Sequence, residues 1–341
     1  MKPCKKKTDI YTPDGWLNVP ALAARSCWLN VITGPRQVGK TYGVLKYMLD
    51  NDRPFILMRR TVEEVQFLGI NQAVNPFAVF RPERDITMDR AGKILNIKEK
   101  EKIIGICMGL PTVATIRGFS AAAFTDIVFD EFIPEKHVVQ RKTEGDALLN
   151  AYTTINGNRE LEGRPPVRLW LLANSNNINS PIMTALGLVD PVLQMRERGK
   201  EIYQRDGILI CQPTSGKIVE QRRDTALMKH LQKTGSAERF TGMALDNEFT
   251  YNDMTLVGKM PLGGLQALCA IGSLYFWQRD DGFLYCCKAP HRTEVYKDTE
   301  YSRESFVNDY WWMFDEYRAS RIKFSDLNLK EQFRLIFDIK F

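Results

Sequence analysis

Residues 30–43 read NVITGPRQVGKTYG, and this stretch decides the fold. A β-favouring apolar run ends at a glycine loop, and a segment with Val44, Leu45 and Met48 at helical spacing follows it. Residues 34–41 satisfy the pattern G-x-x-x-x-G-K-[ST] between a strand and a helix, which is the context that this phosphate-binding motif requires. The sequence therefore predicts a P-loop, and a chance glycine turn before a helix is the weaker interpretation.

The residues of this loop have distinct expected tasks toward ATP. Backbone N–H groups at the start of a helix, whose dipole favours anions, would surround the phosphates. Lys40 would reach the β- and γ-phosphates, and the Thr41 hydroxyl would ligate Mg²⁺. The expected nucleotide-binding set is Gly34, Pro35, Arg36, Gln37, Val38, Gly39, Lys40, Thr41 and Asp130, with Thr41 and Asp130 as metal ligands.

A second apolar run, TDIVFDEF at 125–132, ends in adjacent carboxylates. A P-loop predicts such a strand, because Mg²⁺ needs an acidic ligand from a neighbouring strand. Asp130 would hold the metal, and Glu131 would polarise the attacking water as a general base. A solvated strand end is the simpler interpretation of Asp-Glu alone, but an intact P-loop makes it the minority one.

A third strand candidate, VRLWLLANSNN at 167–177, ends at Asn174 and Ser175, and we expect it beside the Asp130 strand. Asn174 could then sense the γ-phosphate or orient the water, although a polar turn is a serious alternative. Basic residues are harder to assign, since a charge is usually part of a solvated face. The candidates for an arginine that acts on a neighbouring subunit's phosphate are Arg117, Arg159, Arg164 and, inside the loop, Arg36.

The composition limits the kinds of partner and the cellular compartment that we expect for this protein. The 341 residues carry 47 Lys and Arg against 41 Asp and Glu, a net charge of +6 that permits nucleic-acid binding without requiring it. The seven cysteines show no C-x-x-C spacing, which fits a reducing cytoplasm. No apolar run approaches the roughly 20 residues of a membrane span, and no signal-peptide core follows the basic start, so we expect a soluble protein.

Strands alternate with helices to about residue 212, which predicts a mainly parallel α/β domain over 1–212. A basic, helix-forming linker is expected over 213–240. In the remainder, 241–341, the pattern predicts a small α+β domain with an antiparallel hairpin over 268–288 around Asp281-Gly282 and one aromatic-rich helix over 303–320.

Five motifs in this order carry a family resemblance. GPRQVGKT, TDIVFDEF followed by PEK, LLNAYTTINGNRE, LWLLANSNN and ERFTGMALDNEF together resemble the encapsidation protein of short-tailed phages of the phi-29 type. That resemblance implies a P-loop NTPase of the additional-strand, catalytic-glutamate type, which pumps double-stranded genomic DNA into a preformed procapsid. It implies ATP and Mg²⁺ as cofactors and a homo-oligomeric ring, a pentamer, docked at the portal vertex in the host cytoplasm. A structural packaging RNA is a further partner that the sequence leaves open.

The resemblance also implies roles residue by residue. Lys40 and Thr41 match the family's Walker A motif, Asp130 and Glu131 its Walker B motif, and Asn174 its strand-end motif. Its two trans-acting basic residues fall on Arg117, which stands in place of a lysine, and near Arg159. At the second of these positions the family's F-R-N-R-E reads I-N-G-N-R-E here, so the expected arginine aligns with a glycine and the nearest basic residue is Arg159.

The related terminases add a nuclease that needs clustered carboxylates on two metals. The first strand candidates of the C-terminal segment, LQALCAIGSLYFWQR, contain no Asp or Glu. We therefore expect a vestigial RNase H-like domain without nuclease activity. Two different functions remain open: a nucleotide-gated nucleic-acid binding or assembly switch with little turnover, and a small-molecule P-loop kinase.

Overall fold

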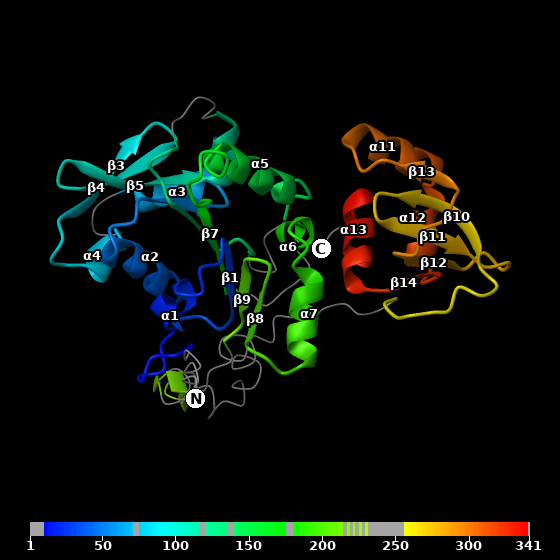
Figure 1. Cartoon of the computed structure of the whole chain (residues 1–341), viewed down its shortest axis with the longest axis horizontal. Helices are drawn as coiled ribbons and strands as arrows, with labels where there is room; N and C mark the ends of the chain where they lie inside the picture. Colours follow the sequence, from blue (N-terminus) through cyan, green and yellow to red (C-terminus); the bar gives the residue numbers. More distant parts are fainter. Residues whose placement is uncertain are drawn as a thin grey trace. The chain divides into compact units, whose positions relative to one another are not determined.

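The computed structural model describes residues 10–70, 75–115, 121–134, 140–174, 180–213, 217–218, 221, 225–226, 229–230 and 256–339 (Figure 1). The chain forms two compact units. The first comprises 1–139, 146–177 and 194–251, and the second comprises 140–145, 178–193 and 252–341. The second unit thus includes two segments that precede residue 212. The expected linker lies mostly outside the described residues, so the predicted boundaries at 212 and 240 stay predictions.

The first unit is built on a nine-stranded sheet in the order β3-β4-β5-β2-β6-β7-β1-β9-β8. From β5 to β9 all neighbours are parallel, whereas β3, β4 and β8 are antiparallel additions at the two edges. This confirms the mainly parallel α/β prediction. The strands are β1 (Leu29–Thr33), β2 (Phe55–Arg59), β3 (Ile86–Ala91), β4 (Ile94–Glu99), β5 (Lys102–Gly109), β6 (Asp126–Asp130), β7 (Arg168–Ala173), β8 (Ile202–Arg205) and β9 (Ile208–Cys211).

The central strands are buried along their whole length because helices cover the sheet. All five residues of β1 and of β6 are buried, as expected for parallel strands with both faces covered. The helices of this unit are α1 (Val19–Ala23), α2 (Lys40–Asp50), α3 (Val62–Leu68), α4 (Phe77–Phe80), α5 (Glu144–Asn156) and α7 (Val189–Glu197), with a 3₁₀ turn at Leu110–Thr115; α5 and α7 also extend into the second unit.

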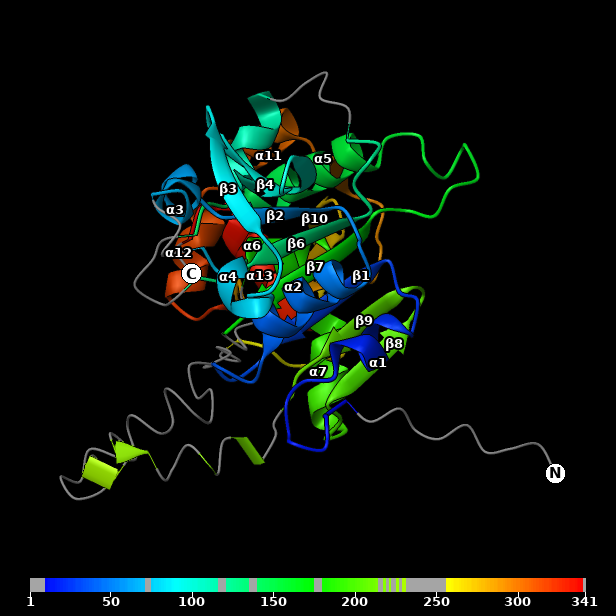
Figure 2. The ribbon, with the colours of Figure 1, turned by 90° about the vertical axis from the view of Figure 1, so that its left-hand side faces the viewer.

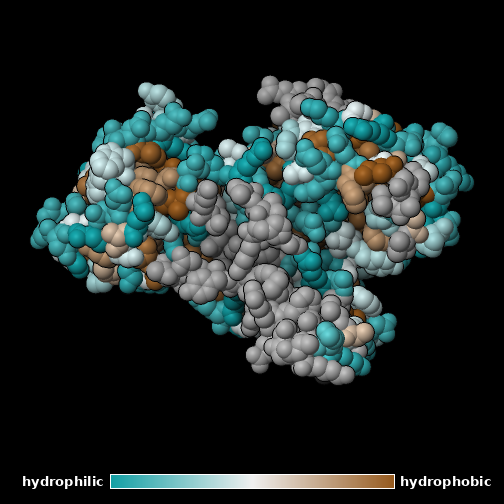
Figure 3. Space-filling model, turned by 180° about the vertical axis from the view of Figure 1, so that it is seen from behind, coloured by the Kyte–Doolittle hydropathy of each residue, from teal (hydrophilic) through white to brown (hydrophobic). Residues whose placement is uncertain are grey.

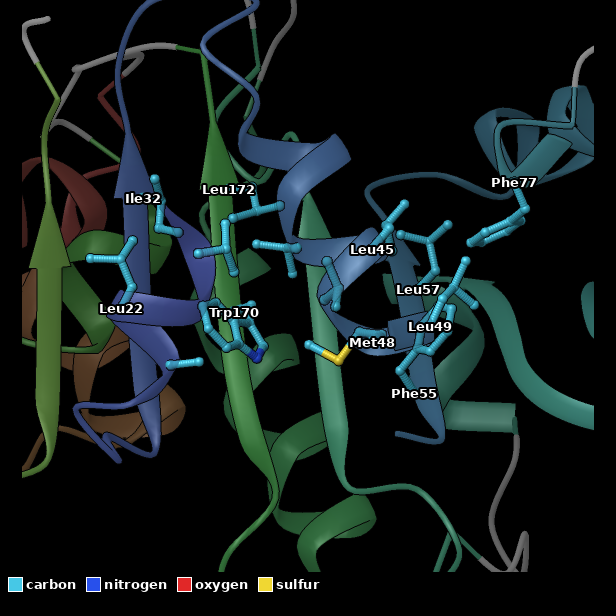
Figure 4. Packing of buried hydrophobic residues seen from close by; sticks show 14 of the residues in the cluster. Leu22, Ile32, Leu45, Met48, Leu49, Phe55, Leu57, Phe77, Trp170 and Leu172 are labelled. Atoms are coloured by element: carbon cyan, nitrogen blue, oxygen red, sulfur yellow. The ribbon is translucent and has the colours of Figure 1, made fainter. Parts of the chain in front are cut away.

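Helix α2 forms the centre of the main core. Its Leu45, Met48 and Leu49 point into the space over the sheet, where they meet Leu57 and Trp170 (Figure 4). All five side chains are at most 2% exposed. Because α2 follows the loop at 34–39 directly, this packing fixes the position of the loop relative to the ends of the strands.

The second unit contains a five-stranded sheet in the order β13-β10-β11-β12-β14. Aromatic side chains, among them Phe276, Phe306 and Phe333, fill its core. Its elements are α6 (Pro181–Ala185), β10 (Gln266–Ile271), β11 (Leu274–Gln278), β12 (Leu284–Cys287), β13 (Glu294–Tyr296), α11 (Glu300–Asp309), α12 (Trp312–Arg318), β14 (Ile322–Phe324) and α13 (Leu327–Ile336).

Two expectations for this unit need correction. The segment 268–288 forms three strands, because a turn at Gly272, with φ of 55°, precedes the expected turn at Asp281-Gly282. The expected single helix over 303–320 is two helices, since α11 ends at Asp309 and the following residue, Tyr310, leaves helical geometry with φ of −119°. Across the described residues, no helix combines the length and apolar character that crossing a membrane needs.

Candidate active site

The loop between β1 and α2 is held in a conformation that depends on its glycines. Gly39 precedes α2 with φ of 90°, a left-handed geometry that side chains rarely adopt. Gly34 lies so close to Pro213 that a Cβ atom there would be 3.1 Å from the proline Cδ. Gly39 is the N-cap residue of α2 and has no side chain, so no side chain accepts from the N–H groups of the first turn of this helix. The loop therefore offers backbone donors at a helix N-terminus.

Lys40 is folded onto its own loop. Its Nζ donates to the carbonyl oxygens of Gly34 at 2.9 Å and Pro35 at 2.5 Å, and the residue is 5% exposed. Burial lowers the pKa of Lys40 to about 8, although the nearby carboxylate of Asp130 opposes that shift. A buried ammonium that is compensated mainly by carbonyl dipoles is a ready partner for an anion.

The two acidic residues stand at the carboxyl end of β6, across from the loop. The Thr41 hydroxyl donates to Asp130 Oδ1 at 2.8 Å, so the first helical turn of α2 and the end of β6 meet directly. Asp130 is buried, whereas the Glu131 side chain is 54% exposed. Glu131 has φ of 56°, the strained geometry that clusters at functional sites. The structure thus brings together Lys40, Thr41 and the acidic pair.

Asn174 joins this group from the neighbouring strand. β6 and β7 are parallel neighbours, as expected, and β7 lies between β6 and β1. The Asn174 side-chain amide donates to Glu131 Oε1 at 3.4 Å. Ser175, the other strand-end residue named above, lies outside the described residues.

Arg59 is a member of the site that the motifs did not single out. It ends β2, and its guanidinium lies 3.2 Å from Asp130 Oδ2 and 3.6 Å from Glu131 Oε2. The signal in the sequence is the Arg-Arg pair that closes the PFILMRR strand, since the carboxyl edge of a parallel sheet is where ligands bind. Arg59 balances both carboxylates from within the same subunit.

The remaining residues of the glycine loop differ in how exposed their side chains are. Val38 is buried, and its carbonyl accepts from Leu17 N–H at 3.1 Å, so this part of the loop is fixed from the N-terminal side. Arg36 and Gln37 are exposed, and Gln37 has φ of 63°. Arg36 is therefore presented to solvent at the mouth of the loop.

The two arginines expected to act in trans have different outcomes. Arg117 lies outside the described residues. Arg159 is 7% exposed, and its guanidinium donates to the carbonyls of Phe124 at 2.8 Å, Ala122 at 3.2 Å and Pro165 at 3.3 Å. These three bonds give Arg159 a structural role in its own subunit, and they do not bring it to Lys40 or Glu131.

This role predicts a stability effect. Arg159→Ala leaves the buried Phe124 carbonyl and the partly buried Ala122 and Pro165 carbonyls without this donor, so we expect the free energy of unfolding of the isolated subunit to fall by about 2–3 kcal/mol. Denaturant unfolding at low protein concentration measures it. Arg164→Ala is the control, because the Arg164 side chain is 41% exposed and forms a surface pair with nearby Glu162; its effect should stay within about 0.5 kcal/mol. An unchanged stability for Arg159→Ala would contradict the structural role.

The donors at this site suit a magnesium nucleotide. Thr41 and Asp130 supply the hard oxygen donors that Mg²⁺ prefers, and Lys40 with the uncapped start of α2 suits a triphosphate. The described residues contain no group of three or more His, Cys, Asp or Glu that could hold a metal. Asp281 of the C-terminal hairpin forms an exposed surface pair with Arg279 at 2.6 Å.

These features define an α/β protein whose mainly parallel sheet gathers a glycine loop, a buried lysine and an Asp-Glu pair at its carboxyl edge. The sequence profile of the Podovirus DNA encapsidation protein (Gp16) family matches residues 13–263. The chain belongs to this family, as the ordered motifs predict.

Individual relatives agree with this assignment. The DNA packaging protein of Bacillus phage B103 is 27% identical over 241 residues, 68% of this chain and 67% of the relative. That of Bacillus phage phi29 is 27% identical over 258 residues, 74% and 70% of the two chains. Two solved structures share the fold. The Phi-28 gp11 DNA packaging motor matches with a TM-score of 0.67 and 16% identity, over 98% of this chain and 99% of that one. The bacteriophage Phi-29 viral genome packaging motor assembly matches with a TM-score of 0.62 and 20% identity, over 94% of this chain and 99% of that one.

Proposed function

We propose that this protein is the ATP-driven motor that moves double-stranded viral DNA into a preformed procapsid. The observation that carries the proposal is the 2.8 Å hydrogen bond from Thr41 to Asp130, which joins the two halves of a nucleotide-hydrolysis site in a chain of the encapsidation family. The names of the relatives, all packaging proteins or packaging motors, support the same conclusion.

Each residue of the proposed site has its own chemical task. Lys40 and the backbone N–H groups of residues 36–41 would hold the phosphates of ATP, and Thr41 with Asp130 would hold Mg²⁺, which neutralises charge on the phosphates when it is bound. Glu131 takes a proton from the attacking water. Asn174 orients Glu131 through the amide contact, and Arg59 keeps both carboxylates in place before nucleotide arrives.

The site is completed by a basic residue from the next subunit of a ring, by family resemblance a pentamer. Arg117 is our first assignment for this residue. Because Arg159 is already bound to three carbonyls of its own subunit, the exposed Arg164 replaces it as the second candidate. The ring docks on the portal of the procapsid in the host cytoplasm, and its DNA contacts are to phosphates, since a motor must ignore sequence.

The second unit completes the proposal as a vestigial RNase H-like domain. The strands β10, β11 and β12 carry no Asp or Glu, so two metals would lack their ligands there. We expect no nuclease activity from it. A structural packaging RNA is a partner that this basic protein could bind in addition.

The decisive experiment is ATP turnover by the assembled protein with and without double-stranded DNA. A motor shows turnover that rises when DNA is added and falls with increasing salt, because phosphate contacts dominate the affinity. A nucleotide-gated switch shows slow turnover that DNA leaves unchanged, and a kinase needs a small phosphate acceptor instead. Absence of DNA stimulation in an assembled ring would contradict the motor.

The pKa of Lys40 makes nucleotide binding depend on pH. A triphosphate binds the protonated form of Lys40, so the binding affinity is full well below pH 8. Above pH 8 the affinity falls by up to about tenfold per pH unit. The fall ends at the higher pKa that Lys40 has in the complex with nucleotide. Titration with a fluorescent, non-hydrolysable ATP analogue from pH 6.5 to 9.5 measures this effect. Lys40→Met should bind weakly with a flat profile, and an equally flat profile for the wild type would contradict the prediction.

A further inference from the structure

Two polar side chains are buried at the start of the glycine loop. Polar residues usually lie on the surface, as on the face shown in Figure 3, where most of the described residues are hydrophilic. Thr33 and Gln212, by contrast, are only 1% and 7% exposed. Thr33 ends β1 and directly precedes Gly34 of the loop, and Gln212 follows the last residue of β9. This position gives the buried pair access to the backbone of the loop.

The register of the sheet brings these two side chains together. β1 and β9 are parallel neighbours with Ile32 opposite Cys211, so Thr33 and Gln212 occupy the next position along each segment. Ile32 and Cys211 belong to the core around α2. Because successive side chains of a strand point to opposite faces, Thr33 and Gln212 face away from that core. There Gln212 Nε2 donates to Thr33 Oγ1 at 2.8 Å.

Arg196 determines which end of the Gln212 amide meets Thr33. It lies in the last turn of α7, which belongs to the first unit, on the same side as the buried Val192. Figure 2 shows α7 beside β8 and β9, and Arg196 Nε donates to Gln212 Oε1 at 3.0 Å. A guanidinium can only donate, so it takes the oxygen end of the amide and leaves the NH₂ end for Thr33. Arg196, Gln212 and Thr33 thus form a relay of two hydrogen bonds.

The inner end of this relay reaches the backbone that holds Lys40. Thr33 is bonded to Gly34 through the peptide, and the Gly34 carbonyl accepts from Lys40 Nζ at 2.9 Å. Pro213, the residue after Gln212, packs directly on Gly34, where an added Cβ atom would lie 3.1 Å from the proline Cδ. The relay therefore fixes the position from which Gly34 offers its carbonyl to Lys40.

The relay is better suited to positioning than to stability. Burying an amide and a guanidinium costs hydration, which only hydrogen bonds can offset, and burial lowers the pKa of Arg196 to about 10. Apolar side chains of the same shape in place of both partners of a buried hydrogen bond can be nearly neutral or stabilising. A hydrogen bond, unlike an apolar contact, also fixes a direction. The direction fixed here is that of the side chain next to the loop.

We propose that Arg196 and Gln212 are positioning residues of the ATP site, which hold the glycine loop in its binding geometry through Thr33. This inference rests on the proposed function, because it takes the loop to be a phosphate-binding loop. The relay lies on β1, after β9 and on α7, whereas Glu131, the proposed base, follows β6. Loss of the relay should therefore weaken nucleotide binding more than it slows turnover at saturating ATP.

Substitution of Arg196 tests the relay at its outer end. Arg196→Met keeps an unbranched apolar stem but removes the donor to Gln212, so the Kd for a fluorescent, non-hydrolysable ATP analogue with Mg²⁺ should rise about tenfold. The kcat at saturating ATP should stay within about threefold of the wild type, as expected when only binding is lost. Arg196→Lys keeps a donor and should restore most of the affinity. Arg198→Met, at an exposed arginine two residues further on, is the matched control and should bind like the wild type.

Substitutions at Thr33 and Gln212 test whether the three side chains act together. Thr33→Ser keeps the acceptor and should bind nucleotide like the wild type, whereas Thr33→Val, with nearly the same shape, should show about the same loss as Arg196→Met. Arg196→Met and Gln212→Met combined should lose no more affinity than either alone, because both interrupt one relay. Additive losses would overturn the relay.

Thermal unfolding of the same variants separates positioning from stability. A lowered melting temperature with wild-type affinity in folded Arg196→Met or Thr33→Val would assign the relay to stability alone and overturn the positioning role. If Arg196→Met does not fold, the comparison of Thr33→Ser with Thr33→Val decides, since these variants differ in the hydroxyl that accepts from Gln212. Equal affinity of these two would overturn the positioning role.

The motor proposal is judged separately by DNA-stimulated ATP turnover of the wild type. Stimulated turnover in the wild type, together with wild-type nucleotide affinity of the relay variants, would overturn the positioning role alone. Nucleotide binding that depends on the relay, without any stimulation by DNA, would overturn the motor and support the positioning role. A wild type that binds no nucleotide would overturn both.

Discussion

Glu131→Gln is expected to lower the rate of ATP turnover by about 10²–10⁴-fold while nucleotide binding is retained. The amide cannot accept the proton of the attacking water, yet it is nearly isosteric with the carboxylate. Glu131 is half exposed and takes no part in the loop that would hold the phosphates, so its loss should not disturb Lys40 or Thr41. Steady-state turnover and fluorescent-nucleotide binding, measured on the same preparation, separate the two effects.

The control for this variant is Glu63→Gln, an exposed acid in the first turn of α3. It should leave turnover unchanged. A motor with Glu131→Gln should bind ATP, hold DNA and stall. Turnover within about threefold of the wild type would remove Glu131 as the base and would favour the nucleotide-gated switch.

Much of the first unit could be predicted because its signals are local. The sequence predicts a helix directly after the glycine loop, and α2 begins there at Lys40. The apolar runs at 125–132 and 167–177 predicted the parallel strands β6 and β7. The prediction that the Asn174 strand lies beside the Asp130 strand is confirmed, because β6 and β7 are parallel neighbours.

What could not be predicted depends on contacts between distant residues. Nothing in the spacing around Arg159 indicates that its guanidinium turns inward to carbonyls 35 and 37 residues earlier. Arg59 likewise reaches Asp130 only because β2 and β6 are neighbours in the sheet. The turn at Gly272 in the second unit is a different case, because Gly272-Ser273 separates two apolar runs and is a local hairpin signal that the prediction of one turn over 268–288 overlooked.

The largest stability effect is expected at Asp126, at the opposite end of β6 from Asp130 and Glu131, the proposed catalytic pair. Asp126 is fully buried, and Arg53 Nε lies 2.7 Å from its Oδ2. Its other oxygen accepts from the indole N–H of the fully buried Trp170 at 3.0 Å. Removing one partner of a buried, hydrogen-bonded pair costs about 3–5 kcal/mol, because the remaining donors keep their desolvation penalty. Asp126→Ala should therefore lower the melting temperature by on the order of 10 °C.

Asp89→Ala is the control for Asp126→Ala, because Asp89 forms a surface pair with Lys98 at 2.8 Å and its side chain is 50% exposed. It should cost less than about 1 kcal/mol. The loss of stability for Asp126→Asn should lie between those of Asp126→Ala and Asp89→Ala. Its amide oxygen can still accept from Trp170, but the charge opposite Arg53 is lost. Below its melting temperature, Asp126→Ala should turn over ATP at a rate close to the wild type. A large loss of turnover in the folded variant would contradict the proposed site, because Asp126 lies at the other end of β6, four residues from Asp130.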